Sequence, residues 1–353
     1  MNVTDIGLLR LAAQRVTGEL FQRPEDVAKH LLAMQSQDYA GGLWSVGLRT
    51  KSATQQDVEK AIAERKIVRT WPMRGTLHFL HADDVHWMVD LLAPRVTASV
   101  RGRRINQLGL TDEVVAEAEA LMRAELKGGR SIERNQVVEL LQSVKGLSID
   151  NQHTQHLMRN FGERGIICFG PHVGKQPTFV LLDEWIPKPA DKPREERLAE
   201  LAERYFVSHG PATLKDFAGW GMLKMSDARV GLEAAKKNLN EEVVDGKVYY
   251  YALGLKPVVQ TETILLPGFD EYILGYKERE TVLAMEHANK VVPGGNGMFL
   301  PTVIQDGQVV GLWKRKINKS GVVFEYNYFP GQKSLTTDVS ETRYQSFVMG
   351  EKV

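Results

Sequence analysis

Two glutamines separated by one residue, Gln35 and Gln37, form a pattern that could do chemistry. They follow a helix predicted to start at Pro24, and Gly41-Gly42 just after them predicts that this helix ends nearby. In an extended or turning segment, residues two apart can project to one side. A carboxamide cannot act as a strong base, so the pair could only orient a nucleophile such as water. By spacing alone, the commoner role of such glutamines is to satisfy backbone groups at a helix end.

Histidines and acids elsewhere in the chain are candidates for metal ligands or for an acid–base pair. His78, on a predicted strand, is followed by His81 and Asp83 at a spacing that matches no established ligand pattern, so we predict no metal. His78 is then a structural residue or one that contacts a binding partner. Asp270 and Glu271 are neighbours on a predicted strand, where side chains point to opposite faces, so we predict a structural role.

The only cysteine, Cys168, lies in an apolar segment and is expected to be a small buried side chain. A single cysteine excludes an internal disulfide and a cysteine-based zinc site. The sequence implies no cofactor.

The formal net charge of +1 does not by itself indicate a nucleic-acid partner, so the distribution of charge must carry that prediction. Basic residues are clustered in three places, and Lys175 occupies the tip of a predicted hairpin loop. For Arg74, at another predicted turn, a phosphate contact and simple exposure stay equally open. The predicted DNA-binding residues are Arg65, Lys66, Arg69, Arg74, His78, Arg101, Arg103, Arg104, Lys175, Lys314 and Arg315.

The chain length of 353 residues predicts two to four packed units. No apolar stretch reaches the length of a membrane span, and the first residues do not resemble a signal peptide. We therefore expect a cytoplasmic protein without a membrane partner.

One order of elements, helix, helix, helix and hairpin, is predicted three times along the chain. This is the order of a winged helix, in which the hairpin covers a small helical core. The predicted hairpin strands are Val68 to Trp71 with Thr76 to Leu80, Ile166 to Phe169 with Thr178 to Leu182, and Glu241 to Val244 with Lys247 to Tyr251.

After about residue 256 three more strands are predicted, at Met298 to Gln305, Gln308 to Lys316 and Val322 to Phe329, with a helix from about Val339. The predicted fold class is α+β, with three tandem winged-helix units and a C-terminal antiparallel β domain. The expected domains are 1–105, containing the Gln-Ser-Gln motif, then 106–188, 189–255 and 256–353.

Several segments together resemble the AlkZ-like winged-helix DNA glycosylases, whose signature is Gln, an apolar residue, Gln. The matching segments are Leu31 to Gln37 with Leu43-Trp44, Arg69 to His78, Gly210 to Thr213 with Asp216 to Trp220, Leu266 to Tyr272 with Gly275-Tyr276, and Asp306-Gly307 with Val310 to Trp313. Ser36 departs from the pattern, because the family usually has an apolar residue there. We expect Ser36 to face away from its neighbours' pocket, so that the change loosens packing more than it removes chemistry.

The resemblance implies that the chain hydrolyses the N-glycosidic bond of alkylated purines in double-stranded DNA, in some relatives including interstrand crosslinks. Gln35 and Gln37 would be the catalytic residues, orienting water toward a base that already leaves easily. No lysine lies in the motif to form a Schiff base, so lyase activity is not expected. Three winged-helix units in one chain suit a monomer. The alternative is a non-catalytic DNA-binding protein or regulator built on the same scaffold.

Overall fold

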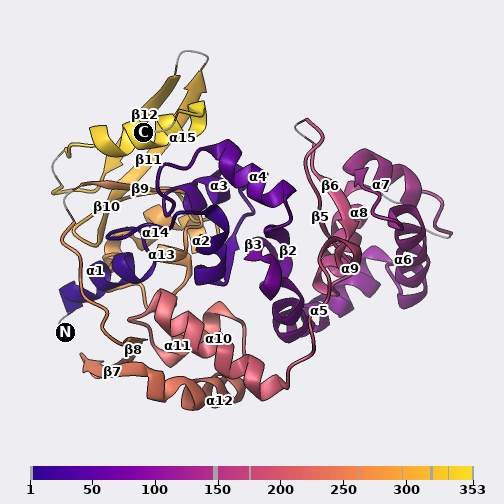
Figure 1. Cartoon of the computed structure of the whole chain (residues 1–353), viewed down its shortest axis with the longest axis horizontal. Coiled ribbons are helices and arrows are strands. Elements are labelled where there is room, and N and C mark those ends of the chain that lie inside the picture. Colours follow the sequence, from indigo (N-terminus) through magenta and orange to yellow (C-terminus); the bar gives the residue numbers. More distant parts are fainter. Residues whose placement is uncertain are drawn as a thin grey trace. The chain divides into compact units, whose positions relative to one another are not determined.

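The computed structural model describes residues 3–145, 150–174, 176–260, 262–295, 297–318, 321–332 and 334–351. The chain forms two compact units, the first made of Met1–Glu59 with Pro193–Val353 and the second of Lys60–Lys192. Both contain helices and antiparallel strands, so the architecture is mixed α/β (Figure 1).

The first unit begins with α1 (Val3–Ala13), α2 (Pro24–Leu31), the short strand β1 (Ala33–Gln35) and α3 (Tyr39–Gly47); α4 (Gln55–Ala63) leads on to the second unit. The sequence did not predict α3, because the Gly-Gly pair that was expected to mark a helix end lies inside it. Its glycines allow close packing: a Cβ on Gly47 would lie 2.2 Å from the ring of Phe347. Tertiary packing has thus overridden the low helix propensity of glycine.

The first unit resumes with three helices and a hairpin, in the predicted order: α10 (Arg194–His209), α11 (Leu214–Trp220), α12 (Met225–Ala235) with a short 3₁₀ turn η2 (Lys236–Asn238), then β7 (Leu239–Val244) and β8 (Lys247–Ala252). Thr213 begins α11 through a capping box, since its hydroxyl accepts the Asp216 N–H at 3.1 Å while the Asp216 carboxylate accepts the Thr213 N–H at 2.8 Å. The hairpin turn Asp245-Gly246 has positive φ at both residues, 48° and 73°, as predicted for a tight hairpin.

The C-terminal part of the first unit is a four-stranded antiparallel sheet in the order β12-β11-β10-β9. Its strands are β9 (Ile264–Leu266), β10 (Thr302–Gln305), β11 (Gln308–Asn318) and β12 (Gly321–Tyr328). Between β9 and β10 lie α13 (Glu271–Leu274), η3 (Met285–His287), α14 (Ala288–Val291) and η4 (Pro293–Gly295), and α15 (Asp338–Met349) packs against β9 and β12. The predicted antiparallel strands and closing helix are confirmed. The strand predicted at Asp270 and Glu271 is wrong: Asp270 caps α13.

The described residues of the second unit form five strands in the order β3-β2-β5-β6-β4, all paired antiparallel. They are β2 (Ile67–Met73), β3 (Thr76–His81), β4 (Ile132–Glu133), β5 (Ile167–Phe169) and β6 (Thr178–Leu181). The helices are η1 (Ala82–Asp84), α5 (Val85–Leu108), α6 (Asp112–Leu126), α7 (Arg134–Leu141), α8 (Asn151–Glu163) and α9 (Leu182–Trp185). Residue 105, the expected end of the first domain, lies inside α5.

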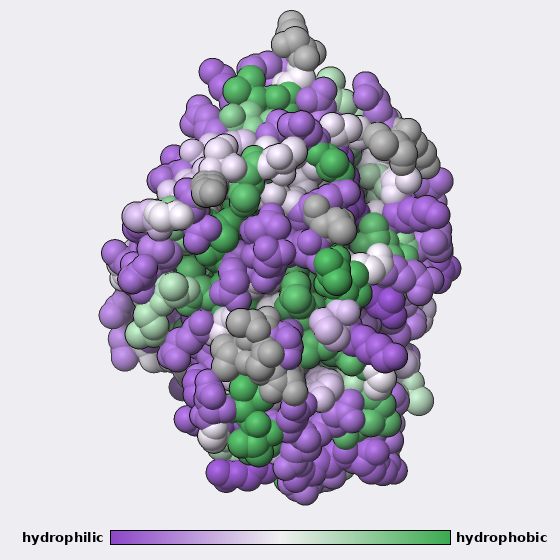
Figure 2. All heavy atoms as spheres, turned by 90° about the vertical axis from the view of Figure 1, so that its left-hand side faces the viewer, coloured by the Kyte–Doolittle hydropathy of each residue, from purple (hydrophilic) through white to green (hydrophobic). Residues whose placement is uncertain are grey.

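The core of the second unit is an apolar cluster that brings α6, α7 and α8 together with the strands and includes Trp71, Phe161 and Phe169. Within the described residues, no helix is long and apolar enough to cross a membrane. The face drawn in Figure 2 is mainly hydrophilic, with apolar residues interspersed. Such scattered exposure is ordinary for a protein surface.

Candidate functional site

The Gln-Ser-Gln motif begins at the last residue of β1, a short strand that directly follows a strained residue. Leu32 ends α2 with φ 67° and ψ −69°, a backbone conformation that is rare and strained for a residue with a side chain. Leu32 is fully buried, as are its neighbours Leu31 and Ala33. Backbone strain of this kind persists only where tertiary packing holds it, and it is concentrated at functional sites.

The two glutamines differ in their exposure. Gln35 is 8% exposed, and its carboxamide oxygen is buried without a hydrogen bond to any described residue. Gln37 is exposed, and Ser36 between them is fully buried. A buried acceptor that the fold leaves unsatisfied costs free energy and calls for a functional explanation. Gln35 is therefore the better placed of the two to hold a water or a substrate group.

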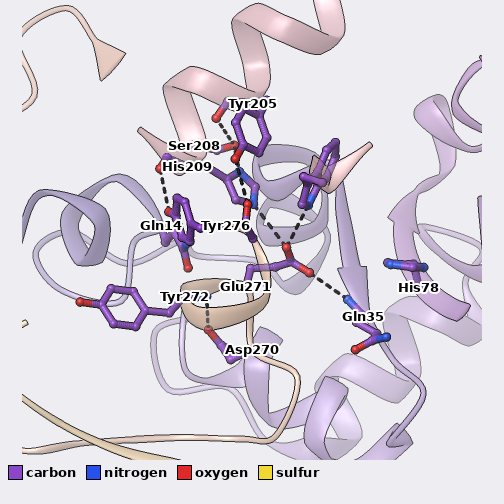
Figure 3. A network of polar contacts seen from close by, with 12 residues as sticks. Gln14, Gln35, His78, Tyr205, Ser208, His209, Asp270, Glu271, Tyr272 and Tyr276 are labelled. Carbon is purple, nitrogen blue, oxygen red and sulfur yellow. Dashed lines mark hydrogen bonds and ion pairs between the residues drawn. The ribbon is translucent and has the colours of Figure 1, made fainter. Parts of the chain in front are cut away.

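Glu271 is the charged side chain that holds Gln35. Its Oε1 accepts a hydrogen bond from the backbone N–H of Gln35 at 3.3 Å, and its Oε2 accepts one from the indole of Trp220 at 3.0 Å. The Nε2 atom of His209 lies 3.5 Å from the same Oε2. Figure 3 shows Glu271 between Gln35 on one side and His209 on the other. Sequence reasoning missed this role because 236 positions separate Glu271 from Gln35.

Asp270, next to Glu271, forms a buried ion pair with Arg49. The guanidinium donates from Nη1 to Oδ2 and from Nη2 to Oδ1, both at 2.8 Å, and the Ser45 hydroxyl donates to Oδ2 at 2.6 Å. Burial by itself raises the pKa of Asp270, but the charge and hydrogen bonds of Arg49 outweigh it and leave that pKa below its ordinary value. The prediction that Asp270 and Glu271 are not an acid–base pair therefore fits their partners, which lie on different elements.

Arg74 and His78 pair with each other in the second unit. The Arg74 Nη2 atom lies 2.9 Å from Nε2 of His78, and the Nδ1 atom lies 2.9 Å from the Thr76 carbonyl. His78 is fully buried, and burial together with the charge of Arg74 holds its pKa well below the ordinary value. A buried imidazole is not exposed to a DNA phosphate, so in this structure His78 is an internal group and not a surface contact.

The predicted DNA-binding cations fall into three groups by exposure. The first group is buried, as His78 is, and consists of Arg69 and Arg104. The Arg69 guanidinium lies 4.7 Å above the Phe169 ring, and Arg104 donates a hydrogen bond to Asp112 at 2.8 Å. These two are not surface contacts here. Lys175 lies outside the described residues. Those that are exposed or half-buried are Arg65, Lys66, Arg74, Arg101, Arg103, Lys314 and Arg315.

Some of the exposed cations already have partners. Arg101 is paired with Asp112, and Lys66 lies 2.9 Å from a Glu64 carboxylate oxygen. Lys314 and Arg315 lie on β11, where the Arg315 guanidinium is 5.2 Å above the Tyr344 ring. Exposed ion pairs such as those of Arg101 and Lys66 contribute little to stability. Of the described His, Cys, Asp and Glu residues, no three are grouped so that they could hold a metal ion.

The family model described as "AlkZ-like: DNA glycosylase AlkZ-like" matches residues 28–331, which include Gln35, Gln37 and Glu271. This chain belongs to the AlkZ-like DNA glycosylase family. A curated relative, the "Interstrand DNA cross-link repair glycosylase" of Streptomyces sahachiroi, is 28% identical over 324 residues, covering 82% of this chain and 81% of the relative. The solved structure of the S. sahachiroi DNA glycosylase AlkZ is similar to this chain with a TM-score of 0.82 and 25% identity, covering 100% of this chain and 98% of that one. The protein is therefore a DNA glycosylase.

Proposed function

We propose that this glycosylase hydrolyses the N-glycosidic bond of alkylated purines in double-stranded DNA, with Gln35 and Gln37 orienting the attacking water. The observation that carries the proposal is the buried carboxamide oxygen of Gln35, an acceptor that no described residue satisfies at the position of the family motif. An amide cannot remove a proton in the manner of a base. The substrate must therefore leave with little help.

N7-alkylated guanine meets that condition because its ring is already positively charged. The bond between C1′ and N9 breaks with its electron pair passing to the base, which becomes neutral. The water oxygen then bonds to C1′, and its proton passes to solvent. The protein has to position the water and to stabilise the positive charge that develops on the sugar.

DNA containing N7-methylguanine tests the proposal. We expect the protein to release the methylated base well above the rate of spontaneous depurination, measured by chromatography of the free base, and to leave unmodified duplex intact. Chain cleavage at the abasic product should need added alkali, because a monofunctional glycosylase forms no Schiff base. Release at the spontaneous rate would exclude this lesion as the substrate.

A purine joined into an interstrand crosslink is a further candidate substrate. It is supported by the name of the S. sahachiroi relative, an "Interstrand DNA cross-link repair glycosylase". Unhooking of an N7-linked crosslink, followed on a denaturing gel, tests it separately from the monoadduct.

The scaffold that we propose is three tandem winged-helix units in a monomer, with domains 1–105, 106–188 and 189–255 before the C-terminal β domain. The order of helices and hairpins in each stretch supports three such units. Their boundaries differ from those of the two compact units, because residue 105 lies inside α5 and the compact units divide the chain after Glu59 and before Pro193. Duplex DNA as substrate agrees with the cytoplasmic location expected from the sequence. The proposed DNA contacts are the exposed or half-buried cations, Arg65, Lys66, Arg74, Arg101, Arg103, Lys314 and Arg315, with Lys175 added from the sequence alone.

We expect DNA affinity to fall steeply with salt, by a slope of about 0.9 per phosphate neutralised in a plot of log K against log salt. Lys314→Ala should reduce that slope by about one unit, because Lys314 is exposed on β11. Lys247→Ala is the matched control, since Lys247 pairs with Glu278 and its loss should leave the slope unchanged. Fluorescence anisotropy across a salt series measures both. A slope near zero for the wild type would show that phosphate contacts do not carry binding.

A further inference from the structure

The start of α13 holds both ends of the segment that carries the Gln-Ser-Gln motif. Glu271 bonds to Gln35 at the end of β1, before the motif, and Asp270 bonds to Ser45 and Arg49 at the end of α3, after it. Two adjacent acids thus fix the chain on either side of residues 36–38. β1 is only three residues long, so the local chain by itself gives the motif little support. The support comes from these two acids, which are distant in the sequence.

We propose that Glu271 is a positioning residue for glycosidic-bond hydrolysis: its carboxylate fixes the backbone of Gln35 so that the carboxamide is oriented toward the water. This inference rests on the proposed catalytic role of Gln35. Glu271 acts through the main-chain N–H and does not itself touch the reacting atoms.

The surroundings of Glu271 make it a rigid support. It is 1% exposed, and Trp220 fixes Oε2 while Oε1 faces the Gln35 amide. The Trp220 ring packs at 5.2 Å from Tyr205 and 5.5 Å from His209, so the donor is itself held by aromatic packing. A buried carboxylate is costly to keep unless it is bonded from several sides. The Nε2 atom of His209, 3.5 Å from Oε2, is a third polar group beside this carboxylate.

The strained residue before β1 explains why a support is needed. Leu32 keeps its unfavourable φ of 67° only under outside restraint, and the motif lies three residues beyond it. The bond from the Gln35 N–H to Glu271 restrains the end of this segment. Without it, relaxation at Leu32 would shift the carboxamide, and a misplacement of about 1 Å can lower a rate on the order of a hundredfold.

The experiment compares Glu271→Ala and Glu271→Gln with wild type in single-turnover excision of N7-methylguanine, with DNA affinity and unfolding midpoint measured on the same samples. We expect Glu271→Ala to slow excision by about 10- to 100-fold while the Kd for DNA changes less than about twofold. Glu271→Gln keeps an oxygen of the same reach for the Gln35 N–H, so it should recover part of the rate. It also guards against an alanine variant that does not fold.

Tyr205→Phe is the matched control for lost stability. The Tyr205 hydroxyl donates to the Gly275 carbonyl at 2.9 Å in the same buried cluster, without contact to Gln35 in the described hydrogen bonds (Figure 3). We expect this variant to lower the unfolding midpoint and to keep the excision rate. If Tyr205→Phe slowed excision as much as Glu271→Ala at equal loss of stability, the effect of Glu271 would be general destabilisation and the proposal would fail.

A double-mutant cycle with Gln35→Ala separates this inference from the proposed function. If Glu271 acts through the Gln35 carboxamide, Glu271→Ala should have little further effect once that carboxamide is gone. If the effects of Glu271→Ala and Gln35→Ala on the excision rate multiplied in the double variant, Glu271 would not act through the Gln35 carboxamide and the positioning role would be overturned. A Gln35→Ala variant with wild-type rate would instead remove the proposed function, whereas a slow Gln35→Ala beside a fast Glu271→Ala would remove this inference alone.

Discussion

Gln35→Ala is expected to slow the release of an alkylated purine by roughly tenfold to a thousandfold while leaving affinity for DNA nearly intact. An orienting amide acts when the water attacks, so its loss appears in the chemical step. Gln37→Ala should also slow excision, but by less, because Gln37 is exposed whereas Gln35 is 8% exposed and its oxygen has no hydrogen bond to the described residues. Single-turnover excision and equilibrium DNA binding measure the two quantities separately.

The double variant Gln35→Ala/Gln37→Ala should cost less than the product of the single effects, since either loss already releases the shared water. Ser36→Ala is the control, because it removes a buried hydroxyl and restores the apolar middle residue of the family signature. We expect its rate to equal or exceed that of wild type. If wild type and the double variant excised the base at equal rates, the two glutamines would not be catalytic, and a role in DNA binding without catalysis by these residues would be favoured.

Asp270→Ala is expected to destabilise the protein by about 3–5 kcal/mol, because it leaves the fully buried Arg49 guanidinium without its carboxylate. Urea unfolding at neutral pH measures the loss. Arg49→Met should lower the free energy of unfolding by a similar amount. The double variant should lose less than the sum of the two, because no uncompensated charge remains in it. Additive losses would show that the pair is not coupled.

The same pair predicts a pH dependence of stability. The pKa of Asp270 in the folded protein lies below its ordinary value, so its contribution is fully present above the unfolded pKa of about 3.9 and is lost as the pH falls through the folded pKa. The stability difference between wild type and Asp270→Ala should therefore be constant near neutral pH and narrow below about pH 4. A difference that grew on acidification would contradict the direction of the shift.

Local sequence patterns were sufficient for much of the secondary structure. The hairpins at Asp245-Gly246 and Asp306-Gly307 follow from residues that tolerate positive φ, and both turns have it. The cap at Thr213 and the proline that begins α2 likewise mark helix starts through groups only a few residues apart. The family motifs pointed to Gln35 and Gln37 for the same reason, since they are contiguous stretches of chain.

Tertiary structure decided what depends on distant parts of the chain. α3 contains two glycines that local propensity assigns to a helix end. Asp270 and Glu271 were expected on a strand but lie at the start of a helix. Three residues that were expected to contact DNA are buried in the structure: His78, Arg69 and Arg104. The bond between Glu271 and Gln35 spans 236 positions. Periodicity and spacing report only on neighbours within a few turns, whereas burial and pairing across the fold arise when distant apolar and charged surfaces are removed from water together.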